Sequence, residues 1–437
     1  MNATTLPTVT LNRLFLFLIQ ILHVCLMDVK PQREWFTPDY KVYHNLTSIA
    51  LTLDRFIKEN ENFVRLVDPS KYLSKQGRKQ YVLHVTNFAN ARLEDTERVK
   101  VLLSFGEHAR EFLPIESLFH LLRRLLKNWK SFDRSDVNLD KLDIYVIALA
   151  NPDGRQHVET SKNYCWRGTS SGVDINRNFD WEFGGKGSSK DPTDEEYHGI
   201  KPFSEPESHV YRDLTEEVQF DGFLSLHSGI KQIYIPFADS VSQKTGRVPD
   251  NVKEMTTLAQ ELATSTIYKY QYGRAVNLND YSADGTVFDY MAGRRKIPFS
   301  YAIELWGPDK HQGPSCFDLF NPPNSRVDIV VSNLYPLYIK FFDYLLDWKK
   351  QSSLNNKLEK ADRSEQLSDK SLPYSALEEQ DVSSLSPILF LLCALVILTI
   401  VVALYGKYPL CRRMYQRRRV VSLRALSSTL SLNLFSV

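Results

Sequence analysis

The chain has 437 residues, with 54 basic and 52 acidic side chains, 43% hydrophobic residues and 12% aromatic residues. This balance excludes a disordered chain, a collagen-like chain and a protein that coats nucleic acid, because each of these has a marked bias in charge or composition. The net charge of +2 is unevenly distributed. Residues 406–437 hold seven basic side chains and no acid, so residues 1–405 carry 47 basic and 52 acidic groups.

The N-terminal region predicts a secretory signal peptide over residues 1–29. Arg13 precedes an apolar stretch over residues 14–27, which is too short to span a bilayer comfortably. An uncleaved membrane anchor is the alternative. A secreted domain is consistent with the sequon Asn45-Leu46-Thr47, in which Asn45 is a candidate glycosylation site.

Residues 36–350 are predicted to form one folded α/β domain. Apolar strands are expected over residues 99–105, 143–149, 222–226 and 299–303, and helices over residues 115–129, 206–217 and 333–348. Nearly continuous apolar strands that alternate with helices indicate a mixed, mostly parallel, twisted central sheet with helices on both faces.

Polar side chains follow each of the four predicted strands. Residues 106–111 follow the first, residues 151–154 the second, His227 and Ser228 the third, and Glu304 the last. Ligands of open α/β sheets bind at the carboxyl ends of the strands. We therefore expect these side chains to meet in one site.

His108, Glu111 and His227 are candidate metal ligands. His108 and Glu111 are three residues apart, and His227 could complete the His₂Glu set that catalytic zinc uses while it keeps a fourth position for water. One His-x-x-Glu pair is weak evidence, because a lone histidine is more often structural. Glu304 ends an apolar strand, and a buried carboxylate is costly unless it is paired or functional.

The C-terminal region predicts a membrane anchor. Residues 351–386 contain nine serines, seven acids and four bases, which is typical of a flexible stalk. Residues 388–405 carry no charge, and with their neighbours they predict a transmembrane helix over residues 387–406. A buried core helix is the alternative.

The basic tail over residues 407–437 predicts that the C-terminus is cytoplasmic, because Lys and Arg are retained on that side of the membrane. The expected protein is therefore a single-pass type I membrane protein. Its domain faces the outside or a lumen, and its partners include the lipid bilayer but no nucleic acid. The basic residues of the tail are Lys407, Arg412, Arg413, Arg417, Arg418, Arg419 and Arg424.

Two of the five cysteines, Cys165 and Cys316, lie in the predicted domain. In an oxidising compartment they could form a disulfide, and the alternative is two free buried thiols.

Seven motifs, in their order and approximate spacing over residues 40–348, resemble the zinc metallocarboxypeptidase family typified by pancreatic carboxypeptidase A. The resemblance implies the zinc carboxypeptidase fold for residues 36–350, with one Zn²⁺ per chain bound by His108, Glu111 and His227. The motifs are His108-x-x-Glu111, Asn151-Pro152-Asp153-Gly154, Trp166-Arg167, residues 172–178, Leu226-His227-Ser228, Tyr281 and Ile303-Glu304-Leu305.

The resemblance also implies the activity: removal of single C-terminal residues from peptides or proteins that have a free terminal carboxylate. Glu304 would be the general base, and Arg167 would polarise the scissile carbonyl. The groups expected to bind the terminal carboxylate are Asn176, Arg177 and Tyr281. Arg110 would lie on the approach to the site, and Asp174 would support a zinc ligand.

Some positions depart from the family or bear on specificity. Tyr164 replaces a family arginine. Phe288 lies seven residues after Tyr281 and suggests apolar or aromatic terminal residues, whereas Asp239 could instead favour basic ones. A Cys165–Cys316 bridge would join two active-site loops.

Two further expectations concern the subtype. The roughly dozen residues between the signal peptide and the catalytic domain leave no room for the inhibitory prodomain of the digestive members. The main alternative function is a catalytically inactive membrane receptor that binds peptide C-termini.

Overall fold

The computed structural model describes residues 37–68, 70–89, 98–130, 139–308 and 315–369. The predicted signal peptide over residues 1–29, the transmembrane helix over residues 387–406 and the tail over residues 407–437 lie outside these ranges. Within the described ranges, no helix combines the length and the apolar character needed to cross a membrane.

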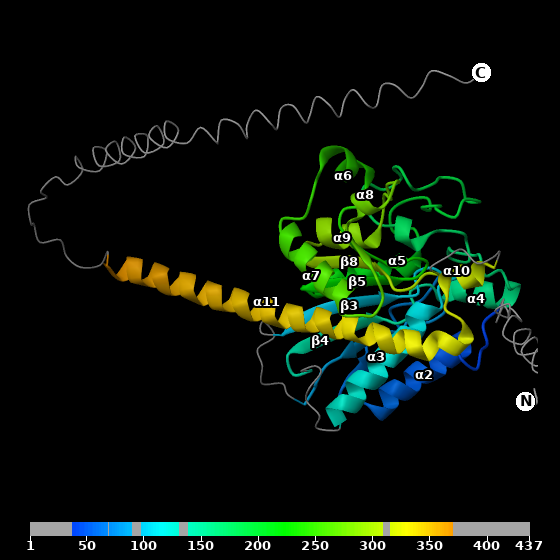
Figure 1. Ribbon diagram of the computed structural model, residues 1–437, viewed down its shortest axis with the longest axis horizontal. Helices are drawn as coiled ribbons and strands as arrows, with labels where there is room; N and C mark the ends of the chain where they lie inside the picture. The colour runs from blue at the N-terminus through cyan, green and yellow to red at the C-terminus, as the bar shows by residue number, and fades with distance from the viewer. Residues whose placement is uncertain (1–36, 69, 90–97, 131–138, 309–314, 370–437) are drawn as a thin grey trace, which may run out of the picture. The chain divides into compact units, whose positions relative to one another are not determined.

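A mixed sheet of eight described strands forms the centre of the fold (Figure 1). The strand order across the sheet is β1-β2-β4-β3-β5-β8-β6-β7. The neighbours β4, β3, β5 and β8 run parallel, and β6 runs parallel to β7. The remaining pairs are antiparallel. The strands are β1 (Val64–Leu66), β2 (Val82–Val85), β3 (Val99–Phe105), β4 (Leu142–Ile147), β5 (Gly222–His227), β6 (Gln232–Ile235), β7 (Gln271–Arg274) and β8 (Phe299–Glu304).

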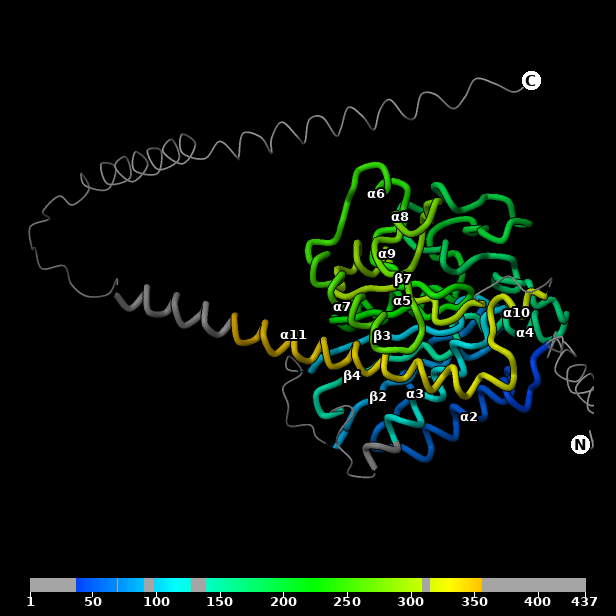
Figure 2. Tube along the Cα trace, in the orientation of Figure 1, coloured from blue at the N-terminus to red at the C-terminus, as the bar shows by residue number. Residues whose placement is uncertain are grey.

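The helices cover both faces of this sheet, which confirms the predicted architecture. Alternate residues of a strand point to opposite faces, so Leu103 joins the core beneath α2, α3, α7 and α11, whereas Leu102 joins the core beneath α5 and α9. Figure 2 traces the chain through these two layers. The helices are α2 (Leu46–Glu59), α3 (Leu113–Lys130), α4 (Pro152–Ser161), α5 (Pro206–Glu217), α6 (Ser240–Thr245), α7 (Val252–Thr264), α8 (Ala275–Leu278), α9 (Val287–Gly293), α10 (Cys316–Phe320) and α11 (Val327–Asp369), with short 3-10 helices at Ile175–Arg177 and Asn324–Arg326.

Helix α11 is much longer than the helix predicted over residues 333–348. Its N-terminal part is amphipathic and buries Leu334, Leu337, Phe341 and Leu345 at helical spacing. The helix then continues to Asp369, where a flexible stalk was predicted. More than half of residues 351–369 are good helix formers, and no Gly or Pro interrupts them. Residues 370–386 of the predicted stalk lie outside the described residues.

Candidate active site

The carboxyl ends of β3, β5 and β8 bring the predicted site residues together. His227 and Glu304 are the last residues of neighbouring strands and are direct partners in the register. His108 follows β3, which is the other neighbour of β5. The turn after β3 needs glycine, because Gly106 has a φ of 70° and a Cβ there would lie 2.6 Å from the Leu149 side chain. The structure therefore brings these predicted residues together at one edge of the sheet.

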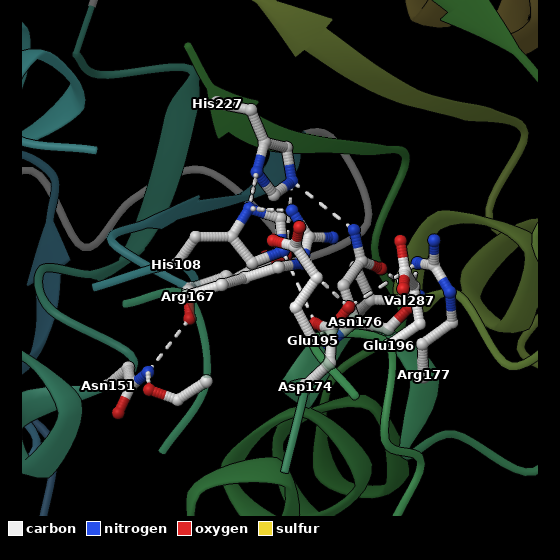
Figure 3. A network of polar contacts seen from close by, with 12 residues as sticks. His108, Asn151, Arg167, Asp174, Asn176, Arg177, Glu195, Glu196, His227 and Val287 are labelled. Carbon is white, nitrogen blue, oxygen red and sulfur yellow. Dashed lines mark hydrogen bonds and ion pairs between the residues drawn. The ribbon is translucent and has the colours of Figure 1, made fainter. Parts of the chain in front are cut away.

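The three candidate metal ligands form one buried cluster, and one ligand atom of each lies within 4.8 Å of the others. His108 Nδ1 is 2.6 Å from Glu111 Oε1, and His227 Nδ1 is 3.1 Å from Glu111 Oε2. The two Nδ1 atoms are only 3.1 Å apart and face each other (Figure 3). Two ring nitrogens and a carboxylate that converge in this way form the His₂Glu donor set of catalytic zinc. These residues fit a zinc ion.

Glu304 lies beside this cluster with one oxygen, Oε2, buried and without a hydrogen-bond partner among the described residues. Burial, together with repulsion from Glu111, raises the pKa of Glu304 to about 7. A buried acceptor without a protein partner is costly unless another molecule supplies the donor. A carboxylate with a pKa near neutrality is suited to accept and return a proton.

Arg167 places a positive charge next to the ligand cluster. Its Nε donates to Asp174 Oδ2 at 2.8 Å, and its Nη1 lies 3.3 Å from His108 Nδ1. Asp174 also lies 3.3 Å from His108 Nε2, on the far side of the ring from the cluster. Burial alone would raise the pKa of Asp174, but Arg167 and His108 hold it well below its ordinary value. Asp174 therefore orients both a cation and a ligand.

Asn176 and Arg177 lie on the 3-10 helix that Asp174 caps. Asn176 Oδ1 accepts from the Val287 backbone N–H at 2.9 Å, which aims its amide nitrogen toward His227. Arg177 donates from Nε to the Gly187 carbonyl and from Nη1 to the Asn176 carbonyl. Among the described residues, its Nη2 has no hydrogen-bond partner. Tyr281 is 61% exposed, so its ring lies at the surface of the site.

Arg110 is held at the edge of the site by contacts that the sequence did not predict. Its Nη1 lies 2.7 Å from Glu195 Oε2 and donates to the Cys165 carbonyl at 2.9 Å, and its guanidinium lies over the Phe320 ring. Glu195 and Glu196 both appear among the site residues in Figure 3. The only signal of this acidic pair in the sequence is the run Asp194-Glu195-Glu196.

Cys165 and Cys316 form a disulfide, as predicted. It connects the loop that carries Arg167 to α10, across 151 residues of sequence. The same loop also supplies the carbonyl that Arg110 contacts. The disulfide therefore joins two segments that border the site.

Cys316→Ser is expected to lower the free energy of unfolding by about 2–5 kcal/mol, because the bridge closes a long loop in the unfolded chain. Urea unfolding of the variant, beside wild-type protein with and without a reductant, measures this. The reduced wild-type protein should match the variant. An unchanged urea midpoint would contradict the stabilising role of the bridge.

Other predicted positions have structural contacts. Phe288 lies on α9, is only 3% exposed and packs in the core beneath α5 and α9. Asp239 caps α6, and its carboxylate accepts from Ser242, Trp181 and Arg247, so a substrate cation would have to displace these donors. Tyr164 is buried against Phe112 and Phe317.

Asn45 is the N-cap of α2, where its side chain accepts from the Ser48 backbone N–H at 2.8 Å. The side chain thus has a structural role in the helix. Glycosylation of Asn45 stays a prediction.

Comparison with known proteins identifies relatives. The family model for zinc carboxypeptidases matches residues 49–335. Carboxypeptidase A1 of Sus scrofa is 30% identical over 285 residues, which cover 62% of this chain and 64% of that protein. Zinc carboxypeptidase A 1 of Anopheles gambiae is 27% identical over 302 residues, 66% of this chain and 65% of that protein. The match thus spans just under two thirds of the length of these relatives.

A solved structure shares the fold. The crystal structure of carboxypeptidase A from Helicoverpa armigera aligns with a TM-score of 0.61 at 22% identity, covering 73% of this chain and 77% of that one.

Proposed function

The chain belongs to the zinc carboxypeptidase family, and from this premise we propose that it is a zinc-dependent metallocarboxypeptidase that removes single C-terminal residues from peptides or proteins. The observation that carries the proposal is the juxtaposition of a buried His₂Glu cluster with Glu304, whose Oε2 is buried without a partner among the described residues. Release of one terminal amino acid from a hippuryl substrate, lost with a chelator and restored with zinc, tests it.

Zinc held by His108, Glu111 and His227 would act as a Lewis acid and lower the pKa of a water molecule. Glu304 would take a proton from that water and deliver it to the leaving amine. Its raised pKa suits both transfers. Arg167 would stabilise the negative charge that develops on the scissile carbonyl oxygen, and one such donor is typically worth about 3 kcal/mol.

Selection of a chain end requires groups that bind a carboxylate. Arg177 has one nitrogen, Nη2, without a hydrogen-bond partner among the described residues, and Asn176 has an amide nitrogen directed toward the cluster. A guanidinium binds a carboxylate through two parallel hydrogen bonds, which favours a terminal carboxylate over an internal peptide bond. Tyr281, at the surface, would complete the set once substrate is bound.

We expect apolar or aromatic terminal residues to be preferred, with hippuryl-Phe cleaved about tenfold or more faster than hippuryl-Arg in kcat/KM. Phe288 is buried in the core, so this expectation depends on Asp239, whose carboxylate is already bound by Ser242, Trp181 and Arg247. Asp239→Asn should leave the ratio of the two rates unchanged. The ratio is insensitive to the folded fraction, so it isolates specificity. Faster cleavage of hippuryl-Arg would contradict the preference.

The domain is proposed to face the outside or a lumen from a single-pass type I membrane protein. The uncharged run over residues 388–405 and the basic residues that follow it support this orientation. We expect the expressed chain to remain in the membrane fraction after carbonate extraction. We also expect a glycosidase to lower the apparent mass of the wild-type chain but not that of Asn45→Gln. Extraction into the soluble fraction would contradict the anchor.

The alternative is a catalytically inactive receptor that binds peptide C-termini with the same fold. Inactivation would be expected to alter a zinc ligand or the base, yet all four are present and close together. The two proposals differ in whether bound peptide is cleaved.

A further inference from the structure

A carboxylate stands behind each of the two zinc-ligand histidines, on the side of the ring that faces away from the cluster. Behind His108 it is Asp174, at 3.3 Å from Nε2. Behind His227 it is Glu107, whose Oε2 is 3.2 Å from Nε2. Glu107 is 1% exposed and directly precedes His108 in the chain. The turn after β3 therefore supplies one ligand and the group that contacts the other histidine.

Three hydroxyl groups surround one oxygen of Glu107. They come from Ser104 on β3, Ser225 on β5 and Tyr211 on α5, and they lie 2.7, 2.9 and 3.2 Å from Glu107 Oε1, respectively. Ser104 and Tyr211 are also 2.6 Å apart, so one of these two hydroxyls donates to the other. Oε1 of Glu107 therefore acts as a hydrogen-bond acceptor. The other oxygen, Oε2, is buried, has no hydrogen-bond partner among the described residues and lies 3.2 Å from His227 Nε2.

The same contacts determine which nitrogen of His227 carries hydrogen. Ser225 Oγ lies 2.7 Å from His227 Nε2 and uses its only hydrogen on Glu107. The hydroxyl oxygen can therefore only accept from the ring, which places the hydrogen on Nε2. The amide nitrogen of Asn176 also lies near Nε2, but at 3.4 Å its contact is much longer than the 2.7 Å contact of Ser225. The lone pair is then on Nδ1, the atom that faces His108 and Glu111.

We propose that Glu107 is a positioning residue for zinc: with Ser225 it holds His227 in the Nε2-protonated tautomer, so that Nδ1 is presented to the ion. Carboxylates behind ligating histidines act in this way in zinc proteins, and their removal typically costs 10–100-fold in metal affinity. The inference rests on the proposed function only in that the metal is zinc.

A merely structural role is the competing explanation, because Glu107 also ties β3 to β5 and α5 through the three hydroxyls. The two roles differ in what they change. A structural tie affects the unfolding temperature and leaves the zinc affinity of the folded protein unchanged. A positioning residue changes that affinity.

The test measures the Kd for zinc alone, by competition with a chromophoric chelator, on the purified full-length chain. Glu107→Gln keeps the side-chain volume and replaces one acceptor oxygen of the carboxylate by an amide nitrogen, which can only donate. The matched control is Glu116→Gln. Glu116 is also a buried acid that contacts a histidine, with Oε2 2.7 Å from His44 Nδ1, but it contacts no zinc ligand. We expect Glu107→Gln to raise the zinc Kd by about 10–100-fold and Glu116→Gln to leave it within twofold.

A second measurement needs no change at position 107. In zinc-loaded wild-type protein labelled with ¹⁵N-histidine, His227 should show a hydrogen on Nε2, assigned as the ring signal that shifts most in Ser225→Ala. Equal zinc Kd values for wild type and Glu107→Gln, or an Nε2 without hydrogen, would overturn the inference. A wild-type chain that binds no zinc would instead refute the proposed function.

Discussion

Glu304→Gln is expected to lower kcat/KM for hippuryl-Phe by about 10²–10⁴-fold while the zinc content stays at one ion per chain. The amide keeps the shape of the side chain but cannot accept the proton of the attacking water. Glu304 is not placed among the ligands, so the metal should stay bound. Peptide cleavage and metal analysis of the same preparation measure both quantities.

Glu207→Gln is the matched control. Glu207 is a buried acid whose pKa is likewise raised to about 7, mainly by burial, and its carboxylate accepts from the Lys75 backbone N–H on the α5 side of the fold. Its substitution should leave kcat/KM within about twofold. If Glu304→Gln retained wild-type activity, the proposed base would be wrong. If the wild-type chain bound peptide without cleaving it, the receptor alternative would hold.

Removal of zinc with a chelator is expected to abolish cleavage and to lower the unfolding temperature. A ligand that binds only the folded state stabilises it by about 4 kcal/mol at a free concentration 1,000 times its Kd. In addition, the metal-free cluster leaves the buried carboxylate of Glu111 without the cation on which the three ligands converge. Activity and thermal unfolding, with zinc restored afterwards, measure the effect.

Magnesium is the control ion for this experiment, because it prefers oxygen ligands and octahedral geometry and should restore neither property. The activity and the unfolding temperature of His227→Ala should match those of the chelated protein, and both should change little when zinc is added. An unfolding temperature that did not depend on zinc would argue against a metal held by these three residues.

Much of the site follows from local patterns in the sequence. An apolar strand that ends in a polar residue predicts where that residue lies, as it does for His227 and Glu304. The pair His108 and Glu111 lies in one turn, so its geometry depends on only a few intervening residues. These features are local, and the order of motifs then indicates the family.

The remaining features depend on contacts between distant residues, which only the strand order brings together. Glu107 meets His227 across 120 positions because β3 lies beside β5, and the disulfide joins residues 151 apart. Likewise, two of the donors that bind the Asp239 carboxylate, Trp181 and Arg247, come from other parts of the chain. The order of the motifs, through its resemblance to a known family, indicated the class of protein and the candidate ligands. The packing of the sheet decided which ring nitrogen of His227 faces His108 and Glu111, because His227 ends β5 whereas the other two residues follow the neighbouring strand β3.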